Sequence, residues 1–226
     1  MSKCLCIAID GPAGSGKSTI SHLVAEKLKL VHLDTGAMYR AIGYKAIMSK
    51  IDLSDSDAII NMLMTTSIDV IFDNDNNQHM IIDNNDITDK IRTSEISRAA
   101  SSVAVIPQVR IKLVELQRKI AESYPIILDG RDIGSYVLPN ADLKIFLTAS
   151  EEIRAKRRLN EQKEKGIECS KSLEQMVTEI AERDYRDSHR EFAPLTVAKD
   201  AVVIDTSYMS IEEVCDKIIG IIRGII

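Results

Sequence analysis

Residues 9–19 read IDGPAGSGKST and are of types that can bind a chain of phosphates. They match the pattern G-x-x-x-x-G-K-[S/T] in full, between an apolar stretch and a helical pattern. The glycines let backbone N–H groups surround a β-phosphate, and the helix N-terminus adds positive potential. Lys17 can reach the β- and γ-phosphates, and Ser18 can bind Mg²⁺. The predicted phosphate-binding residues are Gly11, Pro12, Ala13, Gly14, Ser15, Gly16, Lys17, Ser18 and Thr19.

A second metal-binding group is expected at Asp129, which follows the apolar residues 126–128. A carboxylate in this place lies near Mg²⁺ in nucleotide-binding proteins of this type, directly or through a water molecule. Acidic residues after strands are common, so this pattern alone is not specific. The Asn-Lys-x-Asp sequence with which regulatory GTPases read guanine does not occur in the chain, which weighs against a GTP-dependent switch.

Arginines occur in separate clusters, and their number bears on the fate of the bound phosphates. The clusters are DTGAMYR (34–40), DGRDIG (129–134) and ERDYRDSHREFAPL (182–195). A hydrolase or motor needs one or two cations at the γ-phosphate. Guanidinium groups bind phosphate oxygens through paired hydrogen bonds, so the additional arginines predict a second anionic ligand. The arginines concerned are Arg40, Arg131, Arg183 and Arg190 in these clusters, and Arg110, which lies outside them.

Ion pairs on helix surfaces offer another explanation for these charges. Arg183 and Asp187 could pair one turn apart, and taken alone their stretch fits such pairing better. Arg154, Arg157 and Arg158 stand among glutamates, as on a solvated helix face. The presence of a complete phosphate-binding loop in the same chain favours anion binding.

The elements that must position these groups alternate along the chain. Buried strands are predicted at 3–9, 31–33, 124–129, 143–147 and 201–204. Helices are predicted at 17–28, from 34, from Ser54, at 94–105, 107–122, 150–166 and 170–187, and after a capping box formed by Ser210 and Glu213. Such alternation predicts a parallel α/β sheet. Residues 68–91 differ, because two strand-like runs joined by DNDNNQ predict an inserted hairpin or small meander.

Composition narrows the function classes. The chain has 226 residues, of which 45% are hydrophobic and 28% charged, as in soluble globular proteins. The net charge of −5 weighs against a dedicated nucleic-acid binder. No apolar run approaches the ~20 residues that span a bilayer, and the first residues are too short for a signal peptide. The four cysteines form neither a CxxC pair nor a dense disulfide framework. We expect a reduced, cytoplasmic monomer that binds neither nucleic acid nor membrane.

The chain resembles the bacterial cytidylate kinases, nucleoside-monophosphate kinases that act on CMP and dCMP. The matching stretches are IDGPAGSGKST, LDTGAMYRAIGYKA, IRTSEISRAASSVAVIPQVR, ILDGRDIGS, ADLKIFLTAS and RDYRDSHREFAPL. They run in order from the phosphate-binding loop to about Ile204. Ser135 and Tyr136 depart from the pattern, since many relatives have threonine and a small apolar residue there. This departure affects only the local packing.

The resemblance implies a P-loop NTPase fold with a central parallel sheet flanked by helices. It also implies ATP as phosphoryl donor, Mg²⁺ as cofactor, and CMP or dCMP as acceptor. The implied single domain, residues 1–226, has a core at about 1–50, 94–150 and 190–226, an NMP-binding insert with antiparallel strands at about 51–93, and a helical lid at about 150–170.

The resemblance also implies roles for individual residues. Arg40, Arg131 and Arg183 would face the acceptor phosphate or its sugar, and Asp187 the ribose. The implied substrate-binding residues are Thr35, Tyr39, Arg40, Ser101, Arg110, Arg131, Asp132, Arg183, Asp187 and Arg190, of which Ser101, Arg110 and Asp132 match positions around the cytosine. The implied catalytic residues are Lys17, Arg131, Arg157 and Arg183, the metal ligands are Ser18 and Asp129, and the lid arginines are Arg154, Arg157 and Arg158.

Two alternatives stay open. The chain could be a kinase for a different small acceptor, another nucleotide or a metabolite. It could also be a P-loop ATPase or GTPase that acts as a switch. Transfer to a phosphate acceptor needs no general base, because a phosphomonoester with a second pKa near ~6 is already ionised at neutral pH. This agrees with the lack of metal-ligand or catalytic spacing among the four histidines.

Overall fold

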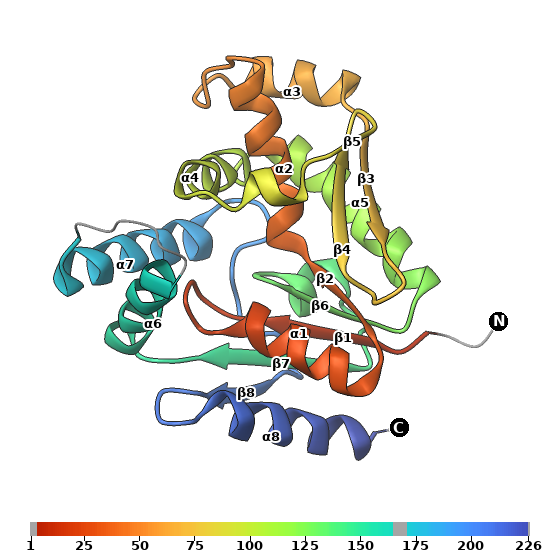
Figure 1. Cartoon of the computed structure of the whole chain (residues 1–226), viewed down its shortest axis with the longest axis vertical. Helices are drawn as coiled ribbons and strands as arrows, with labels where there is room; N and C mark the ends of the chain where they lie inside the picture. The colour runs from red at the N-terminus through yellow and green to blue at the C-terminus, as the bar shows by residue number, and fades with distance from the viewer. Residues whose placement is uncertain (1–3, 165–170, 226) are drawn as a thin grey trace. The chain divides into compact units, whose positions relative to one another are not determined.

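The computed structural model describes residues 4–164 and 171–225 and contains a five-stranded sheet in the order β2-β6-β1-β7-β8 (Figure 1). Its strands are β1 (Cys6–Asp10), β2 (Val31–Asp34), β6 (Ile126–Gly130), β7 (Leu143–Thr148) and β8 (Val202–Asp205). Strand β7 pairs in parallel with β1 and with β8. Parallel neighbours need crossover connections, which the helices between the strands supply. The predicted α/β class is confirmed.

Eight α-helices and two shorter helical turns accompany the strands in the described residues. The helices are α1 (Lys17–Leu28), α2 (Thr35–Met48), α3 (Ser56–Thr65), α4 (Ser94–Val103), α5 (Pro107–Ser123), α6 (Glu151–Glu164), α7 (Leu173–His189) and α8 (Ile211–Arg223). The turns are η1 (Thr88–Ile91), a 3₁₀ helix, and η2 (Ile133–Val137), a π-helix. The predicted end of a helix near Gly166 and the predicted start of the next at residue 170 lie outside the described residues.

The start of α3 differs from the prediction, which placed it at Ser54. Asp55 is the N-cap, and its side chain accepts a hydrogen bond from the backbone N–H of Ala58. The Ser54 hydroxyl instead donates to the Asp52 carboxylate at 2.8 Å. The Ser54 hydroxyl is therefore hydrogen-bonded within the preceding turn, and Asp55 caps the helix instead.

The predicted meander is confirmed as a three-stranded antiparallel sheet. It consists of β3 (Ile68–Phe72), β4 (Gln78–Ile82) and β5 (Asn85–Asp86). The Asp73 carboxylate accepts backbone N–H bonds from Asp75 and Asn77 in the connecting turn. Aspartate in such a turn replaces backbone hydrogen bonds that the strands no longer supply.

The chain divides into two compact units, residues 1–5 with 30–128 and residues 6–29 with 129–226. In the first unit α2 packs closely on α4. A Cβ atom added to Gly43 would lie 2.9 Å from the Cβ atom of Ala99, so only glycine allows this approach. Met38 and Ile42 of α2 are fully buried. This packing fixes the helix that carries Tyr39 and Arg40.

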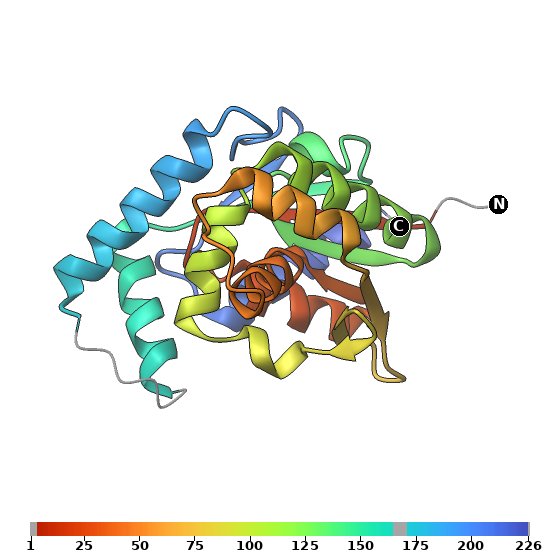
Figure 2. The same ribbon diagram turned by 90° about the horizontal axis from the view of Figure 1, so that it is seen from above.

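The second unit contains β1, β7 and β8 together with two pairs of helices. Helices α1 and α8 lie side by side (Figure 1), as do α6 and α7 (Figure 2). The α6–α7 pair shares a small core of Ala155, Met176 and Ile180. Both the phosphate-binding loop and the 182–195 arginines therefore belong to one unit. Nowhere in the described residues is a helix both long and apolar enough to cross a membrane.

Candidate active site

The phosphate-binding loop joins β1 to α1 in the second unit. Gly14 (φ 75°) and Gly16 (φ 85°) have left-handed backbone conformations, which favour glycine. Gly16 is also the N-cap of α1. Lys17 Nζ donates to the carbonyl oxygen of Pro12 at 3.2 Å, so its side chain folds back along the loop. The loop therefore presents a lysine and a helix N-terminus together, an arrangement suited to anions.

Lys17 is buried among both cations and carboxylates. Burial, with the guanidinium groups of Arg131 and Arg183, lowers the pKa of Lys17 to about 7, while Asp129 and Asp187 act in the opposite direction. Three cations so close to one another repel, and a polyanion offsets that repulsion. The structure thus groups the predicted catalytic residues Lys17, Arg131 and Arg183 around one place.

Ser18 and Asp129 form the expected pair at the loop. The Ser18 hydroxyl donates to Asp129 Oδ2 at 2.6 Å, and Asp129 is buried near the end of β6. Hydroxyl and carboxylate oxygens suit Mg²⁺, which usually keeps several waters and takes phosphate oxygens as further ligands. Across residues 4–164 and 171–225, no three His, Cys, Asp or Glu side chains gather into a metal site of their own. The pair therefore fits a metal ion shared with bound phosphates.

Two carboxylates orient the arginines beyond the loop. Arg131 Nε donates to Asp187 Oδ2 at 2.9 Å, and Arg190 donates to Asp132 Oδ1 at 3.1 Å. Burial works to raise the pKa of Asp187, but Arg131 and Arg183 outweigh it and lower that pKa overall. The Asp132 and Arg190 side chains are each only 6% exposed. Asp187 thus pairs across the unit with Arg131, which the helix-surface alternative did not predict.

One of the predicted lid arginines is bound to the phosphate-binding loop. Arg154 in α6 donates to the carbonyl oxygens of Ala149 and Ala13, each at 2.9 Å, and to the Asp184 carboxylate. Asp184 in α7 also accepts the Ala13 N–H at 3.0 Å. Asp184 was not among the predicted site residues, although its spacing of three from Asp187 places both on one helix face. This aspartate joins α6, α7 and the loop.

The other two lid arginines have different surroundings. Arg157 donates to Thr206 Oγ1 at 2.9 Å and to the Thr206 carbonyl oxygen at 2.6 Å. Arg158 lies 3.4 Å from Glu161 in a partly exposed pair, as the helix-surface alternative expects. Of the predicted lid at 150–170, residues 165–170 lie outside the described part of the chain. A catalytic role for Arg157 stays a prediction.

The first unit carries its own group of predicted residues around the start of α2. Asp34 is the N-cap and accepts the Ala37 N–H at 3.1 Å, and Arg40 donates to its other carboxylate oxygen at 2.7 Å. Burial works to raise the pKa of Asp34, but Arg40 and His32 lower it to about 2. Thr35 is buried in the first turn. Asp34 was not among the predicted site residues, although its place at the start of the predicted helix marks it as a candidate N-cap.

Tyr39 and Arg110 form the second contact of this group. Arg110 Cζ lies 5.4 Å from the Tyr39 ring centroid, within the range of a cation–π interaction. Arg110 is 1% exposed and donates to the Ala104 carbonyl oxygen at 3.3 Å. Ser101 donates to the carbonyl oxygen of Ser97 in its own helix at 3.3 Å. The contacts with Tyr39 and Ala104 fix the orientation of the buried Arg110 guanidinium group.

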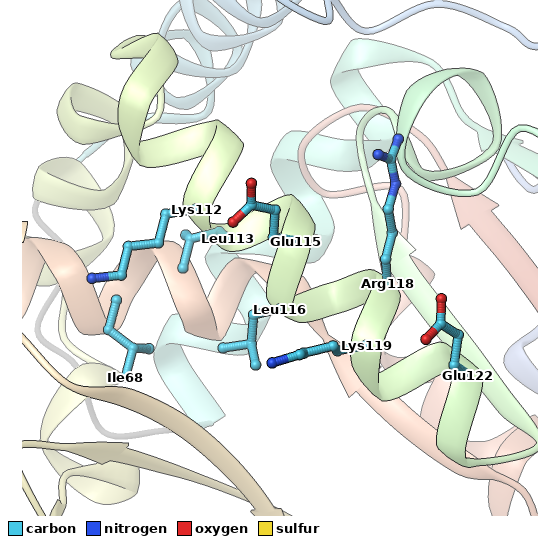
Figure 3. Close-up of a pocket in the computed structure, with 8 residues that line it drawn as sticks. All are labelled: Ile68, Lys112, Leu113, Glu115, Leu116, Arg118, Lys119 and Glu122. Atoms are coloured by element: carbon cyan, nitrogen blue, oxygen red, sulfur yellow. The ribbon is translucent and has the colours of Figure 1, made fainter.

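A groove of about 480 Å³ lies elsewhere in the first unit (Figure 3). Its lining residues are Ile68, Lys112, Leu113, Glu115, Leu116, Arg118, Lys119 and Glu122. Lys112 extends toward Ile68, and its Nζ donates to the carbonyl oxygens of Leu63 and Thr66. Because none of the predicted site residues lines it, the groove adds nothing to the candidate site.

Comparison with known proteins gives matches over nearly the whole chain. A family model described as cytidylate kinase matches residues 7–224. The cytidylate kinase of Caldicellulosiruptor bescii is 49% identical over 220 residues, 97% of this chain and 96% of that protein. That of Bacillus subtilis is 48% identical over 219 residues, again 97% and 96%. A gluconokinase structure from Sinorhizobium meliloti covers 100% of this chain and 95% of its own, with a TM-score of 0.51 and 13% identity, a likeness of fold alone.

Proposed function

Because this chain belongs to the cytidylate kinase family, we propose that its site residues serve one reaction, the transfer of the γ-phosphoryl group of ATP to CMP, giving ADP and CDP. The chain is a nucleoside-monophosphate kinase, and we extend the proposal to dCMP as acceptor. The observation that carries it is the gathering of cations at Lys17, where Arg131 and Arg183 are close enough to lower its pKa. A protein that only binds ATP would need fewer cations at this place.

Positioning and charge neutralisation supply the catalysis in this proposal. The transition state of phosphoryl transfer is loose, with charge on the oxygens of the transferred group. Lys17 would hold the β- and γ-phosphates, while Arg131 and Arg183 hold the acceptor phosphate. An ionised oxygen of CMP then bonds to the γ-phosphorus as the bond to the ADP oxygen breaks. No general base is needed, because that oxygen is already deprotonated at neutral pH.

Ser18 and Asp129 would hold Mg²⁺, which when bound neutralises phosphate charge. Their 2.6 Å hydrogen bond keeps both oxygens at the first turn of α1, beside the lysine that faces the same phosphates. Asp187 stays ionised and directs the Arg131 guanidinium. Net charge −5 supports the further proposal that nucleic acids are not substrates. A cytoplasmic monomer stays a prediction.

A panel of acceptors tests the function. With ATP as donor, we expect CMP and dCMP to give the highest kcat/KM, UMP to follow, and AMP to be poor. ADP release in a coupled assay measures each, and a reaction without acceptor measures hydrolysis. Fast hydrolysis with no transfer would instead favour a P-loop ATPase. Efficient transfer to a non-nucleotide acceptor would favour a kinase for a different small molecule.

Replacing Asp132 by asparagine is expected to narrow the preference for CMP over UMP. Cytosine offers an exocyclic amine to a carboxylate, whereas uracil offers a carbonyl oxygen in the same place. A mispaired buried polar group costs ~1–3 kcal/mol, enough for a preference of about tenfold or more. Arg190 keeps an acceptor at the amide oxygen, so the local structure should survive.

The ratio of the two kcat/KM values is the measurement for Asp132. Arg40→Ala is the comparison, because a phosphate contact carries no base information and should weaken CMP and UMP alike. An unchanged ratio in folded Asp132→Asn would remove Asp132 from base recognition and leave the kinase assignment in place.

A further inference from the structure

Asp10 is a buried residue to which the proposed reaction gives no role. It is the last residue of β1, directly before the phosphate-binding loop, and is 4% exposed. Oδ1 accepts the Ile133 N–H at 2.8 Å, and Oδ2 accepts the Gly134 N–H at 2.7 Å. These amides open the turn η2, immediately after Arg131 and Asp132. One carboxylate therefore joins the root of the loop to the segment that carries two site residues.

Keeping this carboxylate ionised costs the folded chain free energy. Burial raises the pKa of Asp10 to about 6, although the two amide hydrogen bonds act to lower it. An ionised group in an apolar interior is expensive even when it is hydrogen-bonded. An apolar residue in its place would leave the buried Ile133 and Gly134 N–H groups without this acceptor, so the carboxylate is what holds the two amides in position.

A second restraint acts on the same stretch of backbone. A Cβ atom added to Gly134 would lie 3.1 Å from Lys144 Cδ and 3.4 Å from Asp10 Oδ2. Lys144 is buried in β7, and its Nζ donates to Asp200 at 2.8 Å, which holds its methylene stem against the glycine. The start of η2 is thus held by the Asp10 carboxylate and the Lys144 stem together.

We propose that Asp10 is a positioning residue of the transfer reaction, which fixes the backbone of Arg131 and Asp132 relative to the phosphate-binding loop by holding the Ile133 and Gly134 amides. The inference rests on the proposed function. Arg131 can meet an acceptor phosphate, and Asp132 its base, only where this backbone places them. A displacement of about 1 Å can cost up to ~10²-fold in rate.

Asp10→Asn tests the proposal, because an amide oxygen can accept from one N–H while its NH₂ group faces the other. We expect kcat to fall about tenfold and KM for CMP to rise about tenfold, with KM for ATP changed less than about twofold. Asp142→Asn is the matched control. Its carboxylate accepts the Cys6 N–H at 2.9 Å at the other end of β1, and we expect both KM values to stay near those of the unmodified chain.

A second series displaces the same backbone without altering Asp10. Gly134→Ala should reproduce the rise in KM for CMP, and adding Lys144→Ala should partly reverse it by removing the stem that the new methyl group meets. A folded Asp10→Asn chain with unchanged KM for CMP, or with equal changes for both substrates, overturns the proposal. If Asp10→Asn does not fold, unchanged kinetics of Gly134→Ala overturns it. An unmodified chain that transfers to no monophosphate instead refutes the proposed function.

Discussion

Replacing Lys17 by alanine is expected to lower kcat for transfer to CMP by about 10²-fold or more, with the chain still folded. The Lys17 side chain folds back along the loop, where in the proposed reaction charge develops on the transferred group, and losing one such interaction commonly costs ~10²–10³-fold. Folding should survive because burial and two guanidinium groups already disfavour the Lys17 charge. Steady-state kinetics and a thermal melt provide the two readouts.

Lys27→Ala is the matched control for this experiment. Lys27 belongs to the same helix, and its Nζ lies 3.4 Å from Asp216 in a largely exposed ion pair. Such pairs contribute little, so kinetics and melting should both stay near normal. Near-normal turnover by folded Lys17→Ala would refute the assignment of the loop to the donor phosphates.

Arg131→Ala is expected to reduce kcat/KM for CMP by about 10²-fold. A guanidinium group that binds a phosphate through two hydrogen bonds fixes both the position and the direction of the attacking oxygen. Arg131→Lys keeps the charge and a partner for Asp187, but loses the fork, and should recover only a small part of the rate. The series, measured at saturating ATP, separates charge from geometry.

Arg186→Ala supplies the comparison, because that residue lies on the exposed part of α7 and donates to the Glu182 carbonyl oxygen of its own helix. We expect little kinetic change there. If Arg131→Ala raised only the KM for ATP, or if Arg186→Ala lost as much activity, Arg131 would not be an acceptor ligand.

Local sequence rules predicted those parts of the fold that local interactions decide. The capping box of Ser210 and Glu213 forms at the start of α8 as expected, because both of its hydrogen bonds join residues three apart. The start of α3 at Ser54 was wrong, because several neighbouring residues could cap it and Asp52 binds the serine first. The choice among such candidates depends on backbone geometry that the sequence pattern does not contain.

The site residues divide in the same way, into those that local sequence patterns indicate and those that only the folded chain brings together. Spacing identified Lys17 and Ser18, and the sequence also indicated Asp129, which the structure places 2.6 Å from the Ser18 hydroxyl. It did not identify Asp184, which binds Ala13 from 171 positions further along the chain. Nor did it identify Asp10, whose partners lie more than 120 positions away. Carboxylates near strand ends and on helices are too common for their types alone to mark them.

The buried Asp10 carboxylate at the end of β1 also makes the stability of the fold and the reactivity of the acceptor change in opposite directions with pH. Its pKa of about 6 in the folded chain exceeds the usual 3.8, so the folded chain holds this proton more tightly than the unfolded chain. The resulting stabilisation is present below pH about 4 and disappears as the pH rises through about 6, a difference of ~3 kcal/mol out of the ~5–15 that hold a domain folded. The acceptor phosphate, whose second pKa is near ~6, loses its second proton in the same region of pH. As far as Asp10 is concerned, the acidity at which the fold is strongest is that at which its substrate is least ready to react.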